Sequence, residues 1–227
     1  MARWASSLAS AGAVLFIVGP LLAHFGTLPA LGGFFVFGIG GLFSLTAFVL
    51  GLIAVARGAG VGRGLAIGAA VGIVFLLVAV PAGKVPRIND ITTDTTNPPQ
   101  FVGAATLPDN HGRDMRYPGT TFAEQQHAGY PDLAPLRLGL PVDEAFKRVE
   151  AAARSLPNTE IIRIDPSTHV LEGTATTRVF RFHDDFVIEV RPDGAGSIVQ
   201  MRSKSRDGKG DVGANAARIR AVFAKLS

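Results

Sequence analysis

The chain has 227 residues and no cysteine, and its 22 Lys and Arg against 18 Asp and Glu give a formal net charge of +4 at pH 7. Residues 1–87 contain five of these bases and no acid, so residues 88–227 hold the other 17 bases and all 18 acids. This distribution excludes a cationic nucleic-acid-binding domain, and the lack of cysteine excludes a thiolate zinc site. We expect no nucleic-acid partner.

Apolar runs without any charged residue dominate the first 87 residues, which we interpret as a membrane region. A membrane-spanning helix needs about 20 apolar residues. A cleaved signal peptide would need a basic n-region, which Arg3 alone does not provide. We therefore predict three transmembrane helices, at about residues 8–25, 31–55 and 64–82, with the lipid bilayer as a partner.

The bases at the ends of these runs predict an orientation. Lys and Arg near the ends of spans favour the cytoplasmic side, so Arg3 predicts a cytoplasmic N-terminus and Arg57 and Arg63 predict a cytoplasmic second turn. After three spans the rest of the chain would lie on the periplasmic side of a bacterial inner membrane. Lys84 and Arg87 oppose this, but charge counts matter less before a large domain. If the third and shortest run does not cross, the domain is cytoplasmic.

Glycine recurs at every fourth position along the third run, at Gly60, Gly64, Gly68 and Gly72. On a helix this spacing makes a smooth stripe, and such stripes are common packing surfaces between helices in lipid. The stripe packs against the chain's own first two helices, against a second copy of the chain, or against a larger membrane complex.

Residues 88–227 are expected to form a soluble α+β domain. Residues 88–139 are rich in Pro, Thr, Asp, Asn and Gly and predict a long loop that wraps the domain. Apolar spacing predicts helices over about 142–156 and 212–226, the second with Asp211 as its N-cap. Between these helices, strands are predicted at 160–164, 169–177, 178–182, 186–191 and 197–206, with a hairpin turn at 183–185. Two helices around hairpin-rich strands indicate an antiparallel sheet.

The strand near residue 204 contains the first candidate binding site. Alternation along a strand puts Arg202, Lys204 and Arg206 on one face, where the three cations repel unless acids or a bound anion lie nearby. The functional interpretation is a site for a phosphate, a carboxylate or an anionic lipid headgroup, next to a helix N-terminus that favours anions. The alternative is a solvated face whose cations pair with Glu172, Asp184 or Glu189.

A second candidate is the acidic stretch with Asn89, Asp90 and Asp94. Paired carboxylates act as acid and base or bind a hard cation, but this spacing matches no calcium loop, and Asn and Asp also form turns without a ligand. The histidines show no zinc spacing, and no G-x-S-x-G elbow is present. We expect no metal, no cofactor and no assigned catalytic residue.

These two stretches resemble the family called domain of unknown function 1499. Its early N-D-I-[ST]-T-D … P-P-x-F motif is similar to residues 89–94 and 98–101, and its late R-S-x-S-R motif, extended to a helix, is similar to residues 202–219. The resemblance covers most of residues 88–227. It implies that the motif residues cluster, with Asp211, Asn215 and Arg218 on one helix face beside the basic strand. The family has no assigned activity, so the resemblance implies no catalytic residue.

We therefore predict a membrane-anchored extracytoplasmic binding or accessory module that recognises an anionic lipid or polysaccharide. The candidate ligand-binding residues are Asn89, Asp90, Asp94, Arg202, Lys204, Arg206, Asp211, Asn215 and Arg218. An alternative is a cell-envelope hydrolase that uses Asp90, Asp94 or Asp184 as acid or base. A third interpretation is a structural subunit of a larger membrane complex, docked through the glycine stripe.

Overall fold

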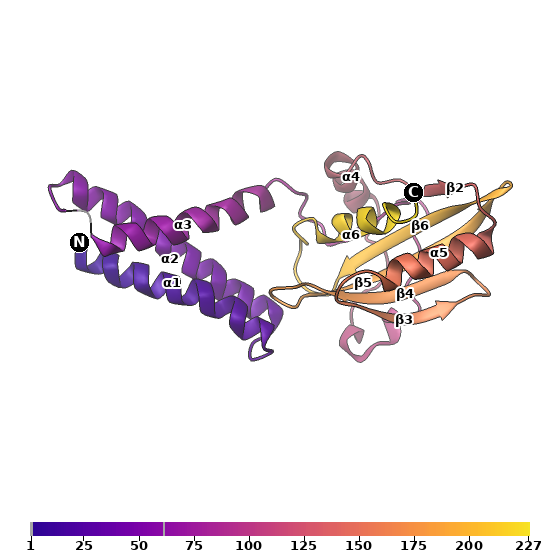
Figure 1. Ribbon diagram of the computed structural model, residues 1–227, viewed down its shortest axis with the longest axis horizontal. Helices are drawn as coiled ribbons and strands as arrows, with labels where there is room; N and C mark the ends of the chain where they lie inside the picture. Colours follow the sequence, from indigo (N-terminus) through magenta and orange to yellow (C-terminus); the bar gives the residue numbers. More distant parts are fainter. Residues whose placement is uncertain (1, 61) are drawn as a thin grey trace. The chain divides into compact units, whose positions relative to one another are not determined.

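The computed structural model describes residues 2–60 and 62–227, and the chain divides into two compact units. One unit comprises the chain up to Lys84 together with Arg178–Arg181, and the other comprises Val85–Thr177 and Phe182–Ser227. Figure 1 shows the helices of the first unit in indigo and purple and the long strands of the second in orange and yellow.

Three helices build the first unit within the described residues: α1 (Ala2–His24), α2 (Ala30–Ala56) and α3 (Arg63–Ala82). Each is long and apolar enough to cross a membrane, which confirms the predicted N-terminal helices. The helix α1 begins six residues before its predicted run, whereas α2 extends one residue beyond its run at each end and α3 begins one residue early. Ala and Arg, which are good helix formers, account for the added residues of α2 and α3.

Small residues fill the interfaces between these helices, and large apolar side chains point outward. The buried positions of α2 are Gly33, Gly40, Gly41, Ser44, Ala47, Gly51 and Ala54. By contrast, Phe35 is 61% exposed and Leu77 is 70% exposed. A helix bundle in water buries its large apolar side chains, whereas helices in lipid meet through small residues because the lipid tails solvate the large ones. The packing thus independently supports a membrane location.

The second unit contains an antiparallel sheet of six strands in the described chain, ordered β1-β6-β5-β4-β3, with β2 also paired to β6. The strands are β1 (Asp90–Thr92), β2 (Leu136–Leu138), β3 (Thr159–Asp165), β4 (Val170–Thr176), β5 (His183–Asp193) and β6 (Gly196–Ser205). The helices are α4 (Thr120–Gly129), α5 (Val142–Arg154) and α6 (Ala214–Phe223), and η1 (Ala104–Thr106) and η2 (Pro108–Asn110) are 3₁₀ turns. The predicted α+β class with an antiparallel sheet is confirmed, while the sequence analysis did not anticipate α4, β1 or β2.

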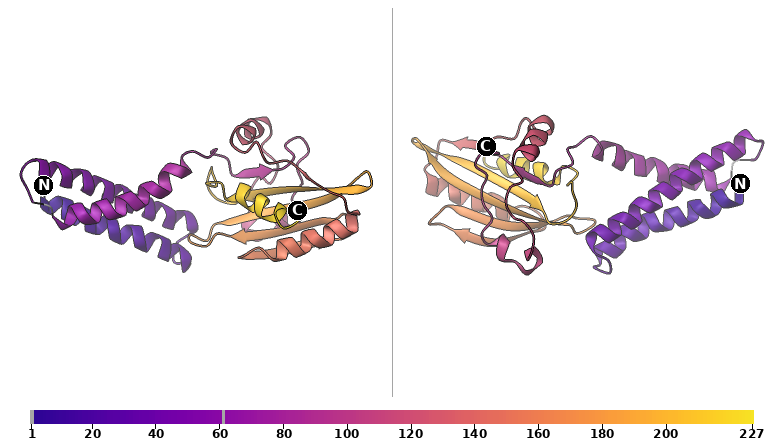
Figure 2. Two further views of the ribbon diagram at one scale, coloured as in Figure 1. Left: turned by 45° about the horizontal axis from the view of Figure 1, so that its top comes forward. Right: turned by 180° about the vertical axis from the view of Figure 1, so that it is seen from behind.

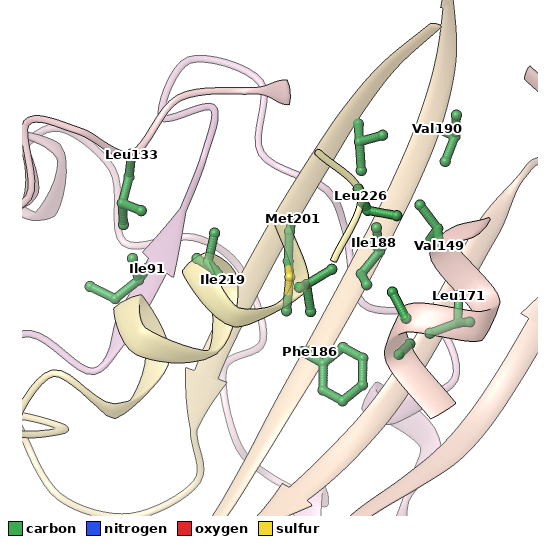
Figure 3. Close-up of a cluster of buried hydrophobic side chains, with 14 of the residues drawn as sticks. Ile91, Leu133, Val149, Leu171, Phe186, Ile188, Val190, Met201, Ile219 and Leu226 are labelled. Carbon is green, nitrogen blue, oxygen red and sulfur yellow. The ribbon is translucent and has the colours of Figure 1, made fainter. Parts of the chain in front are cut away.

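Alternation along the strands gives the sheet two different faces. Phe186, Ile188 and Met201 belong to the main apolar core, which α5 and α6 cover with Val149 and Ile219 (Figure 3). The intervening residues face the opposite side, where Val187 packs on Phe101 and Ala104. Residues 97–118, which we call the covering segment, pass over this second face (Figure 2).

The strand predicted at 178–182 and the hairpin turn predicted at 183–185 are both wrong. Residues 183–185 begin the continuous strand β5, and residues 178–182 form the turn before it, where the Thr177 amide donates to the Phe182 carbonyl over 2.8 Å. Asp is common in turns, so Asp184 and Asp185 indicate a turn when only the local sequence is considered. They stay extended because each carboxylate meets an arginine that is distant in sequence, Arg218 on one face and Arg206 on the other.

Candidate functional site

The strand β6 presents its cations and its serines to opposite faces of the sheet, as the alternation predicts. Arg202 donates to the carbonyls of Pro99 and Met115 in the covering segment. Its neighbour Ser203 instead donates to Oδ1 of Asn215 on α6 over 2.6 Å. The candidate residues named from the sequence therefore divide into two clusters, one on each face.

The first cluster is centred on a buried ion pair. Arg202 and Asp90 are both 0% exposed, and the guanidinium binds the carboxylate through Nε–Oδ1 and Nη2–Oδ2 distances of 2.8 Å. The ring centroids of Phe101 and Tyr117 lie 4.8 and 5.6 Å from the guanidinium carbon. The ammonium of Lys204 shares the same carboxylate at 3.0 Å. One carboxylate therefore faces two cations, and the group of three retains one positive charge.

Arg206 forms a second ion pair on this face. Its Nε and Nη2 bind the carboxylate of Asp185 at 2.9 and 2.7 Å, and this bond raises the pKa of the guanidinium. Asp185 also accepts from Thr174 and from Asn110 at 2.7 Å each. The exposed carboxylate of Asp109 adds a contact to Arg206 at 3.1 Å. The positive charge of Arg206 is therefore compensated by the carboxylates of Asp185 and Asp109.

The acids named from the sequence as partners of these cations have other roles. Glu172 is fully buried and accepts backbone N–H groups of residues 102–104 at 2.8–3.2 Å, with Arg163 at 3.4 Å. Glu189 pairs with Arg191. Glu172 thus holds the start of the covering segment against the sheet.

Asp94 lies in a turn beside the same face. Its Oδ1 accepts the amides of Thr96 and Asn97 at 3.0 and 2.9 Å, and its Oδ2 accepts the side-chain amide of Gln200 at 2.9 Å. This is the side-chain turn that Asp forms without a ligand.

The second cluster joins α6 to the sheet. Arg218 binds Asp184 at 2.7 Å and also donates to Ser203 and Asn215 at 2.8 Å. Asn215 in turn donates to Ser205 at 2.9 Å. Asp90 and Asp184 thus lie on opposite faces, each held by a guanidinium, and they do not form the facing pair of carboxylates that a glycosidase uses.

The loop between β6 and α6 completes this cluster. Asp211 accepts the amides of Gly213 and Asn215 at 2.9 and 2.8 Å. It therefore satisfies the first helical amides as an N-cap does, although α6 begins later than predicted, at Ala214. Burial raises the pKa of Asp211 and these hydrogen bonds oppose the shift. Asn89 donates to the carbonyl of Gly208 at 2.8 Å and so fixes the loop to the strand β1.

A pocket of about 360 Å³ opens at the edge of the first cluster, lined by Asp114, Arg116, Tyr117, Pro118 and Lys204. Lys204 reaches it with a side chain that is 14% exposed. The hydroxyl of Tyr117 is buried and has no hydrogen-bond partner among the described residues. Burial, and then the charge of Asp90, raise the pKa of Tyr117 to about 12, so this hydroxyl is a donor at neutral pH.

The mouth of the pocket holds an exposed ion pair. Arg116 binds Asp114 through two contacts of 2.9 and 2.7 Å, and this hydrogen bonding lowers the pKa of the carboxyl group. Lys204 was predicted from the sequence as a ligand-binding residue, whereas Arg116 and Tyr117 were not. Only the path of the covering segment brings these residues to the strand, and no spacing in the sequence signals that contact.

The predicted glycine stripe faces the neighbouring helices of the first unit. Gly64, Gly68 and Gly72 are buried. A Cβ atom at these positions would lie 2.7 Å from the Ser6 nitrogen, 2.8 Å from the Phe48 nitrogen and 2.8 Å from Cδ2 of Leu45, respectively. A Cβ at Gly60 would meet nothing within 4 Å.

No group of three His, Asp or Glu side chains suited to a metal ion occurs among the residues that the structure describes. A family model described as "Protein of unknown function (DUF1499)" matches residues 90–226. A comparison with curated proteins gives no match. The matched range contains every candidate residue of both clusters except Asn89.

Proposed function

Since the chain belongs to the DUF1499 family and carries apolar helices long enough to cross a membrane, we propose that it is a membrane-anchored extracytoplasmic binding module for an anionic group. The proposed site is the pocket between Lys204 and the covering segment. The observation that carries the proposal is that the same pocket is lined by Lys204, a cation, and by Tyr117, whose buried hydroxyl has no hydrogen-bond partner among the described residues.

The charges around the pocket favour an anion. Arg202 already occupies both oxygens of Asp90, which is the one carboxylate that pairs with the ammonium of Lys204 among the described residues. An ammonium has three donors, and Asp90 takes one of them. The pair of Asp114 and Arg116 is neutral overall and adds no charge. A phosphate or carboxylate group would compensate the remaining positive charge and accept the hydroxyl of Tyr117.

Removing a single donor tests this site. A Tyr117→Phe variant keeps the ring beside Arg202 but lacks the hydroxyl, and Lys204→Met keeps most of the side-chain length without the charge. Each should weaken binding at least about tenfold, the usual effect of losing a hydrogen bond to a charged group. Binding of inorganic phosphate and of acetate to the purified full chain, measured by calorimetry, gives the readout.

Lys147→Met is the matched control, because Lys147 is an exposed cation on α5, on the other side of the sheet. It should bind like the parent. Equal binding by the parent and both pocket variants, or no binding by the parent, would refute the proposed site.

A further inference from the structure

Three connections leave the sheet of the second unit at one end. Strand pairing places the start of β1 (Asp90) opposite Lys204, and the start of β5 (Asp184) opposite Ser205. The end of β4 (Thr176) pairs with His183. The linker 84–89, the turn 177–182 and the loop 206–213 therefore emerge together. We call this the linker end of the sheet.

The linker end is joined to α3 by a short connection. The helix α3 ends at Ala82 and β1 begins at Asp90. An extended residue spans at most about 3.5 Å, so Arg87 lies within about 18 Å of the end of α3. The loop 206–213 is fixed to the linker, since Asn89 donates to the carbonyls of Gly208 and Ser205.

Most cations in the three connections of the linker end form no ion pair with another described residue, unlike most other cations after residue 83. Ion pairs join most of the others to a carboxylate, as at Arg148, Arg191 and Arg220. Within the described chain after residue 83, the cations without an ion pair are Lys84, Arg87, Lys147, Arg178, Arg181, Lys209 and Lys225. All but Lys147 and Lys225 belong to the connections of the linker end.

The acids of these connections do not compensate this charge. Asp207 pairs with Arg113, and Asp211 is bound by the first amides of α6. At the strand starts, Asp90 and Asp184 are held by Arg202 and Arg218. The linker end therefore carries several cations with no local partner.

Exposed apolar side chains lie among these cations. Val179 is 52% exposed in the turn, and Val212 is 57% exposed in the loop. Val212 also has a φ of 54°, which a β-branched residue rarely adopts. Cations that flank exposed apolar side chains suit the interface of a bilayer, where headgroup phosphates meet the cations and the upper acyl chains meet the apolar groups.

We propose that the linker end binds anionic phospholipid headgroups and so holds the domain against the bilayer surface. The site is separate from the pocket at Lys204 and does not depend on the function proposed above. Its partner is the lipid surface that anchors the chain, and each cation near an anionic surface contributes about fivefold to the binding constant at physiological ionic strength.

A fluorophore on a single cysteine tests the contact in the full chain, which has no native cysteine. The variants Val212→Cys and Val179→Cys carry the probe at the linker end. Ala195→Cys carries it in the turn between β5 and β6, at the opposite end of the sheet. Each protein is placed in nanodiscs of phosphatidylcholine alone or with about one third phosphatidylglycerol, together with a lipid that carries a nitroxide near its headgroup.

Quenching at positions 179 and 212 should rise at least about twofold with the anionic lipid and stay unchanged at 195. A variant with Arg87, Arg178, Arg181 and Lys209 replaced by Ser should lose this rise, and the matched Lys147→Ser, Lys225→Ser variant should keep it. Equal quenching in both lipids at both linker-end probes, or a rise that survives the four Ser substitutions, would overturn the proposal. Having two probe positions keeps the test decisive if one substitution disturbs its loop.

Discussion

The guanidinium of Arg202 ties three parts of the chain to the centre of the sheet. It binds Asp90 on β1 and the carbonyls of Pro99 and Met115, which lie near the two ends of the covering segment. A charged side chain that is 0% exposed is stable only when its hydrogen bonds are satisfied. At the scale of the residue, Arg202 is thus an internal support, while Lys204, two positions along the strand, reaches the pocket.

Replacing Arg202 should be far more costly than replacing an exposed arginine that makes a similar ion pair. Arg202→Met leaves the buried Asp90 with Lys204 alone, and breaking a buried pair in this way costs about 3–5 kcal/mol. Arg116→Met removes an exposed pair with Asp114, which solvent screens and which therefore contributes little to stability. Pulse proteolysis in urea, applied to the full chain in mild detergent, measures both. Similar urea midpoints for the two variants would contradict the structural role of Arg202.

Within the helices, packing and not composition alone decides which glycines are needed for close contact between helices. In α3, Gly68 lies where a Cβ would meet the Phe48 nitrogen at 2.8 Å and the Ser44 oxygen at 2.9 Å. In α2, a Cβ at Gly38 would meet nothing within 4 Å. Both glycines sit in helices of similar apolar composition, and only the helix contacts distinguish them.

This contrast predicts opposite effects of one methyl group. Gly68→Ala should destabilise the helices of the first unit by about 1–3 kcal/mol, because the added atom forces the backbones apart. Gly38→Ala should be neutral or stabilising by up to about 1 kcal/mol, through the better helix propensity of Ala. Trp4 is the chain's one tryptophan and lies in α1, so its fluorescence during denaturation of the full chain reports on this unit. Equal changes of the denaturation midpoint in the two variants would show that Gly68 is not a close helix contact.

Elements also show where local sequence patterns mislead. His183, Asp184 and Asp185 have the composition of a turn, yet they form the start of β5 because Arg218 and Arg206 neutralise the two acids from opposite faces. Periodicity predicted α5 well, since its apolar residues follow the helical repeat and face one core. It missed α4, whose ten residues bury only Gln126 and show no apolar stripe.

For the molecule as a whole, the charges beside the helices predict the orientation of the chain in the membrane. Arg57 and Arg63 flank the turn between α2 and α3 and favour the cytoplasm, so with three crossings we predict that the domain lies outside. A membrane-impermeant maleimide applied to intact cells tests this orientation. Ala128→Cys, exposed on α4, should be labelled, and Gly60→Cys, in the turn between α2 and α3, should not.

Labelling of both proteins after the cells are opened is the control for cysteine reactivity. The reverse pattern, with position 60 labelled from outside and position 128 protected, would place the domain in the cytoplasm. It would also exclude periplasmic ligands for the pocket at Lys204.

Three features could be predicted from the sequence: apolar helices of membrane length, an antiparallel α+β domain and a strand with alternating cations. They depend on composition and on short-range periodicity, which neighbouring residues are enough to define. Which cations are buried in ion pairs and which reach solvent follows from the folded structure and not from these local patterns. Asp90 and Arg202 are 112 residues apart in the chain, and Tyr117 reaches the pocket of Lys204 only through the path of the covering segment. An ion pair forms where two side chains are close in space, and local sequence patterns do not reveal which remote segments the fold brings together.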